Sequence, residues 1–300
     1  SRMIDVEALI AFSAVMDAGS FSGAAARLGQ TPSGVSRTIA RLEKHLGLTL
    51  LHRTTRRLQL TDEGAWLLAR ARTLLADLAN TEAEAAARRS QPAGLVRVNA
   101  ATPALGHLLA PLVPAFIDAY PLVRLELTSG ETVVDLIEER ADLAIRIGSL
   151  PDSTLNARRL GTSRLRVLAS PAYLERHGAP ASVADLARHR LLGFAAPATL
   201  NTWPLAHGGA EGYTIDPSVT SSSGETVRHL ALAGAGIASL SNFLTREDLA
   251  TGRLVPVLED AALPWSQPVW AVFYKQGGLA PRVAALVEFL ARELGPVLDA

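Results

Sequence analysis

Small hydroxyl side chains and arginines recur along residues 32–46, and together they could read or grip a nucleic acid. Apolar residues at helical spacing in this segment predict an amphipathic helix, with the polar residues on or beside the face turned away from the core. Short hydroxyl side chains permit close approach in a DNA major groove, and arginine can contact guanine or phosphate. The candidate DNA-contacting residues of this helix are Ser33, Gly34, Ser36, Arg37, Thr38 and Arg41.

Two further helices are predicted to position this one. Thr31 suits an N-cap, and Pro32 suits the first helical position, where its missing N–H costs nothing. Residues 21–28 predict a preceding helix, rich in small residues that allow a close crossing, with Gly29 as its C-terminal stop. An amphipathic helix over residues 5–16 would supply the core behind the pair. This arrangement is a helix-turn-helix.

The residues after this motif predict a basic wing. Residues 48–60 alternate as two short strands around a polar tip. The candidate backbone or minor-groove contacts of the wing are Arg53, Thr54, Arg56 and Arg57. Residues 27–57 hold seven basic residues against one acidic residue, a net charge of +6 that favours phosphate contact. A solvated basic face is the alternative for an isolated cluster, but the helix pattern favours DNA.

Several short motifs follow one another in this part of the chain. They are Ala24–Leu28, Thr31–Arg37, Leu42–Gly47, Leu50–Arg57 and Leu60–Gly64. Their order and spacing resemble the N-terminal signature of the LysR-type transcriptional regulators, a family of bacterial winged helix-turn-helix proteins. Leu51 stands where the family usually has Phe, and Gly34 where Ala is commoner; the second change would loosen the helix by about 1 kcal/mol. The resemblance implies a sequence-specific DNA-binding regulator that responds to a small molecule.

Composition excludes several other classes of protein. The chain has 300 residues, a formal net charge of zero and no cysteine, which excludes disulfides, thiolate metal sites and a cysteine redox switch. No uninterrupted apolar segment of about 18 residues predicts a membrane span, and no charged-then-apolar signal opens the sequence. We therefore expect a cytoplasmic protein that makes no contact with a membrane. Residues 1–2, which precede Met3, are left out of the fold argument.

Residues 62–90 predict a long helix that links two domains. Apolar and small residues repeat there at spacings of three and four, as in the seam of a coiled coil. The seam consists of Leu67, Ala71, Leu74, Leu78, Thr81 and Ala85. A helix of this length, about 40 Å, packs either on its own domain or on a partner. The resemblance favours the partner, because it implies antiparallel linker helices in a homodimer, and it further implies homotetramers.

From residue 95 onward, strand and helix patterns alternate and predict an α/β domain with mainly parallel sheets. Strands are predicted over 96–100, 123–127, 143–148, 165–169, 191–195, 236–240 and 269–274, and helices over 105–118, 132–140 and 281–294. The resemblance implies two Rossmann-like lobes joined by crossover strands, as in periplasmic solute-binding proteins. The predicted domains are a winged helix-turn-helix over 3–61, a linker helix over 62–90 and an effector-binding domain over 94–300, with lobe I over 94–163 and 268–300 and lobe II over 164–267.

Ligands of open α/β sheets bind beyond the carboxyl ends of the strands, where helix N-termini offer free N–H groups. Hydroxyl residues stand at three such positions. For each of them taken alone, capping the N-terminus of a helix is the commoner role. The cleft that the resemblance implies would bring the three positions together. The candidate effector-binding residues are Thr102, Pro103, Ser129, Arg146, Gly148, Phe194, Ala196, Ser221 and Ser222. Free N–H groups beside hydroxyls favour a small carboxylate or a similar anion.

The sequence argues against an enzyme. Gly234–Ser239 resembles a dinucleotide loop, but it lacks the third glycine and follows a predicted helix, so we interpret it as a site of tight packing. No nucleophile elbow, phosphate-binding lysine loop or paired-histidine metal motif is present, and we expect neither catalysis nor a cofactor or metal. The alternative to a regulator is a solute-binding protein, which the effector-binding domain fits and the DNA-binding segment does not. The resemblance also implies DNA bending and, in an activator, contact with RNA polymerase.

Overall fold

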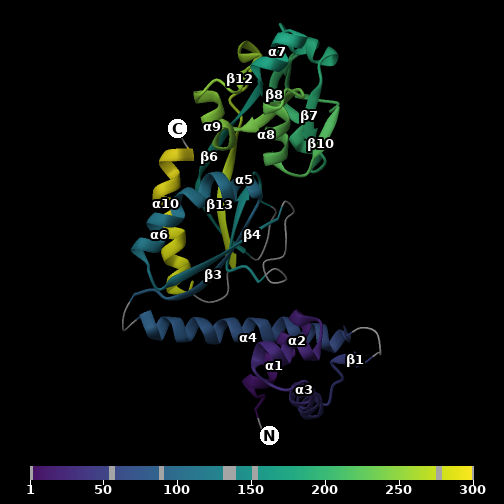
Figure 1. Ribbon diagram of the computed structural model, residues 1–300, viewed down its shortest axis with the longest axis vertical. Helices are drawn as coiled ribbons and strands as arrows, with labels where there is room; N and C mark the ends of the chain where they lie inside the picture. Colours follow the sequence, from purple (N-terminus) through teal and green to yellow (C-terminus); the bar gives the residue numbers. More distant parts are fainter. Residues whose placement is uncertain are drawn as a thin grey trace. The chain divides into compact units, whose positions relative to one another are not determined.

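The computed structural model describes residues 3–53, 58–87, 91–130, 140–150, 155–274 and 279–298 (Figure 1). The chain divides into two compact units, residues 1–88 and 89–300, because most contacts lie within one unit or the other. Each unit is described by itself. No helix in the described ranges combines the length and apolar character that crossing a membrane requires.

The first unit is a helix-turn-helix followed by a short hairpin and a long helix. Its elements are α1 (Val6–Ala18), α2 (Phe21–Leu28), α3 (Pro32–Leu46), β1 (Leu51–Arg53), β2 (Leu58–Leu60) and α4 (Asp62–Ala87). Local chemistry sets the helix ends, because the side chains of Asp5, Ser20 and Thr31 accept N–H groups of the first turns. Gly29 and Gly47 end α2 and α3 with φ of 63° and 67°, a conformation that glycine adopts without strain.

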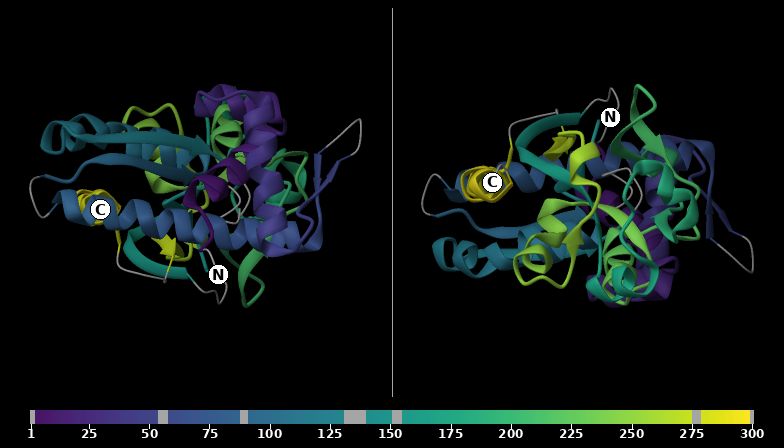
Figure 2. Two further views of the ribbon diagram at one scale, coloured as in Figure 1. Left: turned by 90° about the horizontal axis from the view of Figure 1, so that it is seen from below. Right: turned by 90° about the horizontal axis from the view of Figure 1, so that it is seen from above.

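Helix α4 is one uninterrupted helix of 26 residues, seen along its length in the left view of Figure 2. Leu67, Leu68 and Ala71 are buried in the core of the first unit. Leu74 and Leu78, one and two turns further on, keep 53% and 46% of their surface exposed. The predicted coiled-coil seam is therefore wrong for its first two positions, Leu67 and Ala71, because α4 packs there on its own unit.

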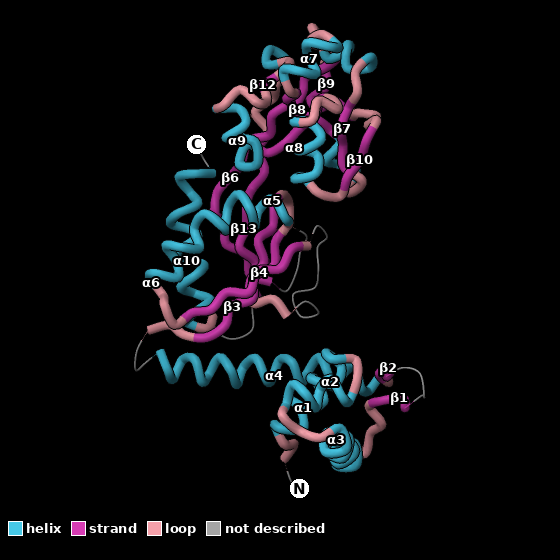
Figure 3. Tube along the Cα trace, in the orientation of Figure 1, coloured by secondary structure: helices cyan, strands magenta, loops and turns pink. Residues whose placement is uncertain are grey.

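The second unit contains a mixed sheet whose described strands run in the order β10-β7-β11-β6-β13-β5-β3-β4, with β12 beside β6 (magenta in Figure 3). The strands are β3 (Gly94–Ala100), β4 (Val123–Ser129), β5 (Leu143–Ile147), β6 (Leu155–Ala169), β7 (Leu191–Phe194), β10 (Val219–Ser221), β11 (Ile237–Ser241), β12 (Val255–Pro256) and β13 (Ser266–Tyr274). A separate hairpin pairs β8 (Thr202–His207) with β9 (Ala210–Thr214).

Two parallel groups of strands lie at the ends of this sheet. Strands β4, β3 and β5 are parallel at one end, and β10, β7 and β11 are parallel at the other. Strands β6 and β13 lie between the groups and pair antiparallel with each other and with their neighbours. The sequence therefore predicted the parallel groups, while the two middle strands make the sheet mixed.

Helices cover the sheet. They are α5 (Thr102–Ala104), which continues through a π-helical turn (Leu105–Leu109) and a 3-10 turn (Ala110–Leu112) into α6 (Val113–Ala119), then α7 (Pro171–His177), α8 (Gly224–Leu232), α9 (Asn242–Ala250) and α10 (Pro281–Leu298). Further 3-10 turns are Val183–Arg188, Ala198–Asn201 and Glu259–Ala261. Helix α10, seen end-on in Figure 2, buries its apolar face against β3 and β6. Residues 131–139, where a helix was predicted, lie outside the described ranges.

The glycine-rich segment before β11 is a site of tight packing, as its sequence suggested. A Cβ at Gly236 would lie 2.4 Å from the carbonyl oxygen of Arg190, so a larger residue there would displace the backbone that leads into β7. Gly236 follows α8 rather than a strand, which excludes the dinucleotide-loop geometry.

Candidate DNA-binding surface and ligand cleft

Helix α3 presents a polar face built on a buried apolar stripe. Val35 and Ile39 are fully buried and Leu42 nearly so, all within the core of the first unit. The predicted contact residues divide by exposure: Ser33, Arg37 and Arg41 are exposed, whereas Gly34, Ser36 and Thr38 are half-buried. The face that the sequence assigned to DNA is therefore turned away from the core.

The start of α3 explains one departure from the family pattern. Thr31 Oγ1 accepts the N–H of Gly34 at 3.1 Å and lies 3.3 Å from Ser33 Oγ. A Cβ at Gly34 would lie 3.1 Å from the same oxygen, so alanine would crowd the cap. Further along the helix, Arg41 donates to Thr38 Oγ1 at 3.3 Å, which aligns the guanidinium with the exposed face.

The wing is described at its base. Strands β1 and β2 pair antiparallel, with Leu51 opposite Leu60 and Arg53 opposite Leu58. The backbone of Arg53 thus ends β1, while Thr54, Arg56 and Arg57 lie outside the described residues.

Glu43, the one acidic residue of the basic segment 27–57, was not among the predicted site residues. Its Oε1 accepts the backbone N–H of Leu50 at 2.8 Å and that of Leu51 at 3.3 Å. The recognition helix is therefore tied directly to the base of the wing. A glutamate on a solvent-accessible helix carries no sequence signal for a backbone contact seven residues away.

The ligand-cleft candidates fall into two groups. Pro103 lies in α5, and Phe194 ends β7. A Cβ built at Gly224 would lie 3.4 Å from Pro103 Cγ and 3.8 Å from Phe194 Cε1. Both candidates therefore lie beside the same glycine. Ser221 is opposite Phe194 in the β10–β7 register, and Ser129 is opposite Ala100, which leads into the segment holding Thr102. Ala196 and Ser222 are exposed just beyond these strand ends.

Arg146 and Gly148 have their contacts within the β3, β5 and β13 part of the sheet. Arg146 donates to Asn99 Oδ1 at 3.2 Å, and Asn99 donates to Thr128 Oγ1 at 3.3 Å, so three adjacent strands carry one polar row. Gly148 donates its N–H to Pro268 and accepts the indole N–H of Trp270 at 2.9 Å. Neither Asn99 nor Thr128 was among the predicted site residues: Asn99 lies inside the predicted strand 96–100, and at the end of the next strand Ser129 was chosen over Thr128.

The guanidinium of Arg146 is partly buried. Burial lowers the pKa of its guanidinium below the ordinary value. One terminal nitrogen, Nη2, is buried and has no hydrogen-bond partner, and among the described residues no carboxylate forms an ion pair with it. An anion beside this group would offset part of the desolvation.

A polar chain crosses from the segment after α5 to α8. His107 Nε2 lies 2.7 Å from Glu225 Oε2, and the other oxygen of Glu225 accepts a hydrogen bond from Arg228 at 2.7 Å. Arg228 also donates two hydrogen bonds to Asp248, from Nε to Oδ2 at 2.6 Å and from Nη2 to Oδ1 at 2.9 Å. Arg253 Nη2 forms an ion pair with the same fully buried carboxylate at 2.9 Å. The segment after α5 and the first turn of α8 are thus joined by a hydrogen bond to a carboxylate.

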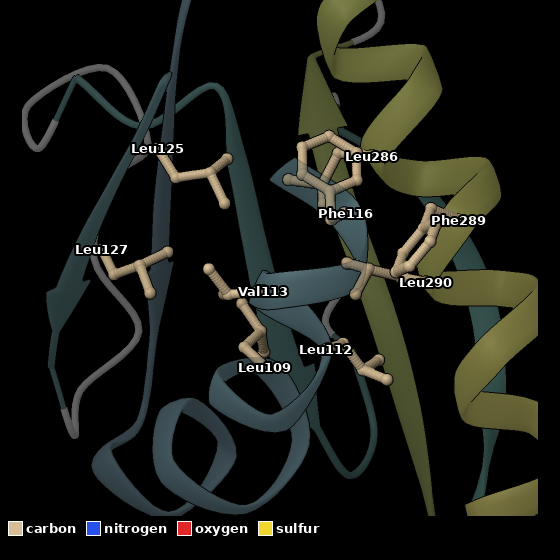
Figure 4. Close-up of a pocket in the computed structure, with 9 residues that line it drawn as sticks. All are labelled: Leu109, Leu112, Val113, Phe116, Leu125, Leu127, Leu286, Phe289 and Leu290. Carbon is tan, nitrogen blue, oxygen red and sulfur yellow. The ribbon is translucent and has the colours of Figure 1, made fainter. Parts of the chain in front are cut away.

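An apolar crevice lies between α6, β4 and α10 (Figure 4). Its lining is Leu109, Leu112, Val113, Phe116, Leu125, Leu127, Leu286, Phe289 and Leu290. It has room for about 10 Å³, which is barely enough for one water molecule, so it is too small for an effector. A larger hollow of about 390 Å³ in the first unit is lined by Met3, Ile4, Val6, Leu9, Leu74, Leu75 and Leu78. Among the described residues no His, Asp or Glu cluster is arranged to hold a metal.

Two family models match the sequence. Residues 6–65 match the bacterial regulatory helix-turn-helix protein of the lysR family, and residues 89–295 match the LysR substrate binding domain. The chain belongs to the LysR family. The predicted family, fold class and regulator function are thereby confirmed: this is a DNA-binding transcriptional regulator with a substrate-binding domain, and not an enzyme.

Relatives of this LysR chain match it along most of its length. The HTH-type transcriptional regulator CrgA of Neisseria meningitidis serogroup C (strain 8013) is 46% identical over 289 residues, 96% of this chain and 97% of the relative. The regulator DmlR of Escherichia coli (strain K12) is 34% identical over 272 residues, 90% of this chain and 88% of the relative. The solved structure of CrgA superposes with a TM-score of 0.67 at 44% identity, covering 98% of this chain and 100% of that chain.

The Glu225 carboxylate makes the stability of this LysR substrate-binding domain depend on pH. Burial would raise its pKa, but hydrogen bonds and charges from His107 and Arg228 outweigh burial and hold the pKa below its ordinary value. A lowered pKa stabilises the folded state above the ordinary value of about 4.3, and this contribution is lost as the pH falls through the folded value.

We therefore expect the free energy of unfolding of the wild type to fall more steeply below about pH 4.3 than that of Glu225→Gln. Urea unfolding of the full chain across this range measures the difference. Glu211→Gln, at an exposed glutamate of β9, is the matched control and should follow the wild type. Parallel curves for the wild type and Glu225→Gln would show that the carboxylate contributes nothing.

Proposed function

We propose that α3 enters the major groove of operator DNA. The observation that carries this proposal is the exposed polar face of α3, where Ser33, Arg37 and Arg41 are presented from a helix whose opposite side is locked in the core. Gly34, Ser36 and Thr38 lie on the margin of this face, close enough for small side chains to allow approach to the bases. The helix-turn-helix of the family supports the same role.

The wing is the second DNA contact in this proposal. Arg53, Thr54, Arg56 and Arg57 of the wing would hold the phosphate backbone or the minor groove, because Arg53 ends β1 and the other three follow closely in the sequence. Contacts of this kind fix the orientation of a protein on DNA and make its affinity depend on salt.

Arg37→Ala and Arg41→Ala should each weaken binding of a duplex that the wild type has selected from a random pool. The expected loss is about 1–3 kcal/mol per arginine if it contacts a base edge. Fluorescence anisotropy against the selected duplex and a scrambled one measures affinity and specificity. Arg70→Ala, which removes an exposed arginine from α4, is the control for charge alone. Unchanged affinity in both α3 variants would contradict the groove-reading role.

We further propose that the hollow between α1 and α4 is covered by a second copy of the chain, forming a homodimer through the linker helix. Support comes from its purely apolar lining and from Leu74 and Leu78, which remain exposed along the continuation of a buried stripe. Exposed apolar surface of this kind marks an interface. Pairs of such dimers would give the homotetramer of the family pattern, acting in the cytoplasm and contacting RNA polymerase.

Leu78→Glu should dissociate this dimer, because it places a charge in the apolar hollow. Sedimentation velocity of the full chain is expected to show a smaller species at concentrations where the wild type is dimeric or larger. Ala76→Glu makes the same change at an exposed position about half a turn away and should not alter the mass. If Leu78→Glu keeps the wild-type mass, the subunits associate elsewhere.

We propose that a small anionic effector, such as a carboxylate, binds at the cleft marked by Thr102, Pro103, Ser129, Phe194 and Ser221. Gly148, Ala196 and Ser222 complete the proposed site. Support comes from the contact of Pro103 and Phe194 with Gly224 and from the desolvated, unpaired nitrogen of Arg146. An effector can act only by binding one arrangement of the lobes better than another.

A panel of small carboxylates, phenols and amino acids should contain a ligand that stabilises the full chain in a thermal-shift assay. At 100 times its dissociation constant, such a ligand adds about 2.7 kcal/mol. Thr102→Ala should remove the shift, whereas Thr81→Ala, at an exposed threonine of α4, should retain it. A shift that survives Thr102→Ala, Ser129→Ala and Phe194→Ala would place the ligand outside the cleft.

A further inference from the structure

The backbone of one residue, Leu50, joins three elements of the first unit. The N–H of Leu50 donates to Glu43 on α3 at 2.8 Å, and its carbonyl oxygen accepts the N–H of Thr61 at 3.0 Å. Leu50 itself is fully buried in the core of this unit. Leu50, the residue before β1, is therefore hydrogen-bonded to the recognition helix through its N–H and to the residue before α4 through its carbonyl.

The first turn of α4 packs against the backbone of Thr49 and Leu50. Thr61 Oγ1 donates to the carbonyl of Thr49 at 2.6 Å and accepts the N–H of Gly64 at 2.9 Å. A Cβ at Gly64 would lie only 2.0 Å from the Leu50 carbonyl oxygen. This approach requires glycine, and it places the helix backbone directly on the base of the wing.

We infer that Glu43 is a positioning residue for DNA binding. Its carboxylate fixes the base of the wing to the recognition helix, and through Leu50 both are fixed to the start of α4. The inference rests on the proposed contact of the wing with DNA. Without an acceptor at position 43, the Leu50 N–H would lose its partner in a buried place, and β1 would lose its anchor at the end that leads into the wing.

Electrostatics and positioning predict opposite effects for Glu43. A carboxylate in a segment of net charge +6 reduces the attraction to phosphate, so its removal alone should tighten DNA binding. If the hydrogen bond to Leu50 positions the wing, removing the acceptor should weaken binding despite the more favourable charge. The sign of the change therefore separates the two effects.

Glu43→Ala and Glu43→Gln make the same change of charge, but only glutamine keeps a carbonyl acceptor. We expect Glu43→Gln to bind the selected duplex at least as tightly as the wild type and Glu43→Ala to bind about tenfold more weakly. Glu63→Ala, at an exposed glutamate in the first turn of α4, is the charge control and should not weaken binding. Circular dichroism confirms that each variant is folded, and Glu43→Met replaces Glu43→Ala if the latter is not.

Hydroxyl-radical footprinting supplies a readout that a general loss of stability would not give. In Glu43→Ala we expect loss of the flanking protection that Arg53→Ala and Arg56→Ala also remove, with the central protection by α3 retained. Equal affinities for Glu43→Ala and Glu43→Gln, while the wing variants bind weakly, would overturn the positioning role alone. Unchanged affinity in the wing variants would overturn the wing contact, and the inference with it.

Discussion

Helix α4 is longer than the part of the first unit that covers it, and this constraint shapes the unit. An amphipathic helix of 26 residues carries an apolar stripe along one side. Exposing apolar surface to water costs roughly 25 cal/mol per Å² of free energy. The core behind α1 and α3 buries the stripe as far as Ala71 and covers Leu75 in part. The remaining stripe adjoins the apolar N-terminal residues Met3 and Ile4, so the same helix serves the core with one half and an apolar surface with the other.

The second unit has a different constraint, which is the buried charge of Asp248. An isolated carboxylate at full burial would cost several kcal/mol, and Arg228 and Arg253 offset this cost from two directions. The two hydrogen bonds from Arg228 to Asp248 join helices α8 and α9. Within α8, Glu225 accepts a third hydrogen bond from Arg228 and so fixes the direction of the guanidinium. Glu225 is also linked to the segment after α5 through the half-buried imidazole of His107, at 2.7 Å.

Sequence reasoning succeeded where structure is local. The caps at Thr31 and Gly29 and the apolar stripe of α3 are encoded within a few residues, and the structure has each of them. It failed for contacts between distant segments. Asn99 meets Arg146 across 47 residues, and no spacing rule connects them. Strand β6 was predicted over residues 165–169 only, because its first ten residues gain their strand partner from β13, more than a hundred residues later.

Strands β6 and β13 also limit how the second unit can change shape. They form one long antiparallel ladder, and its register shifts between Val269 and Trp270, opposite Gly161 and Arg159. A bulge allows a ladder to bend without losing its hydrogen bonds on either side. Bending there would change the distance between the two parallel strand groups, and with it the His107–Glu225 contact. An effector would favour one bend over another only to the extent that it binds that bend better.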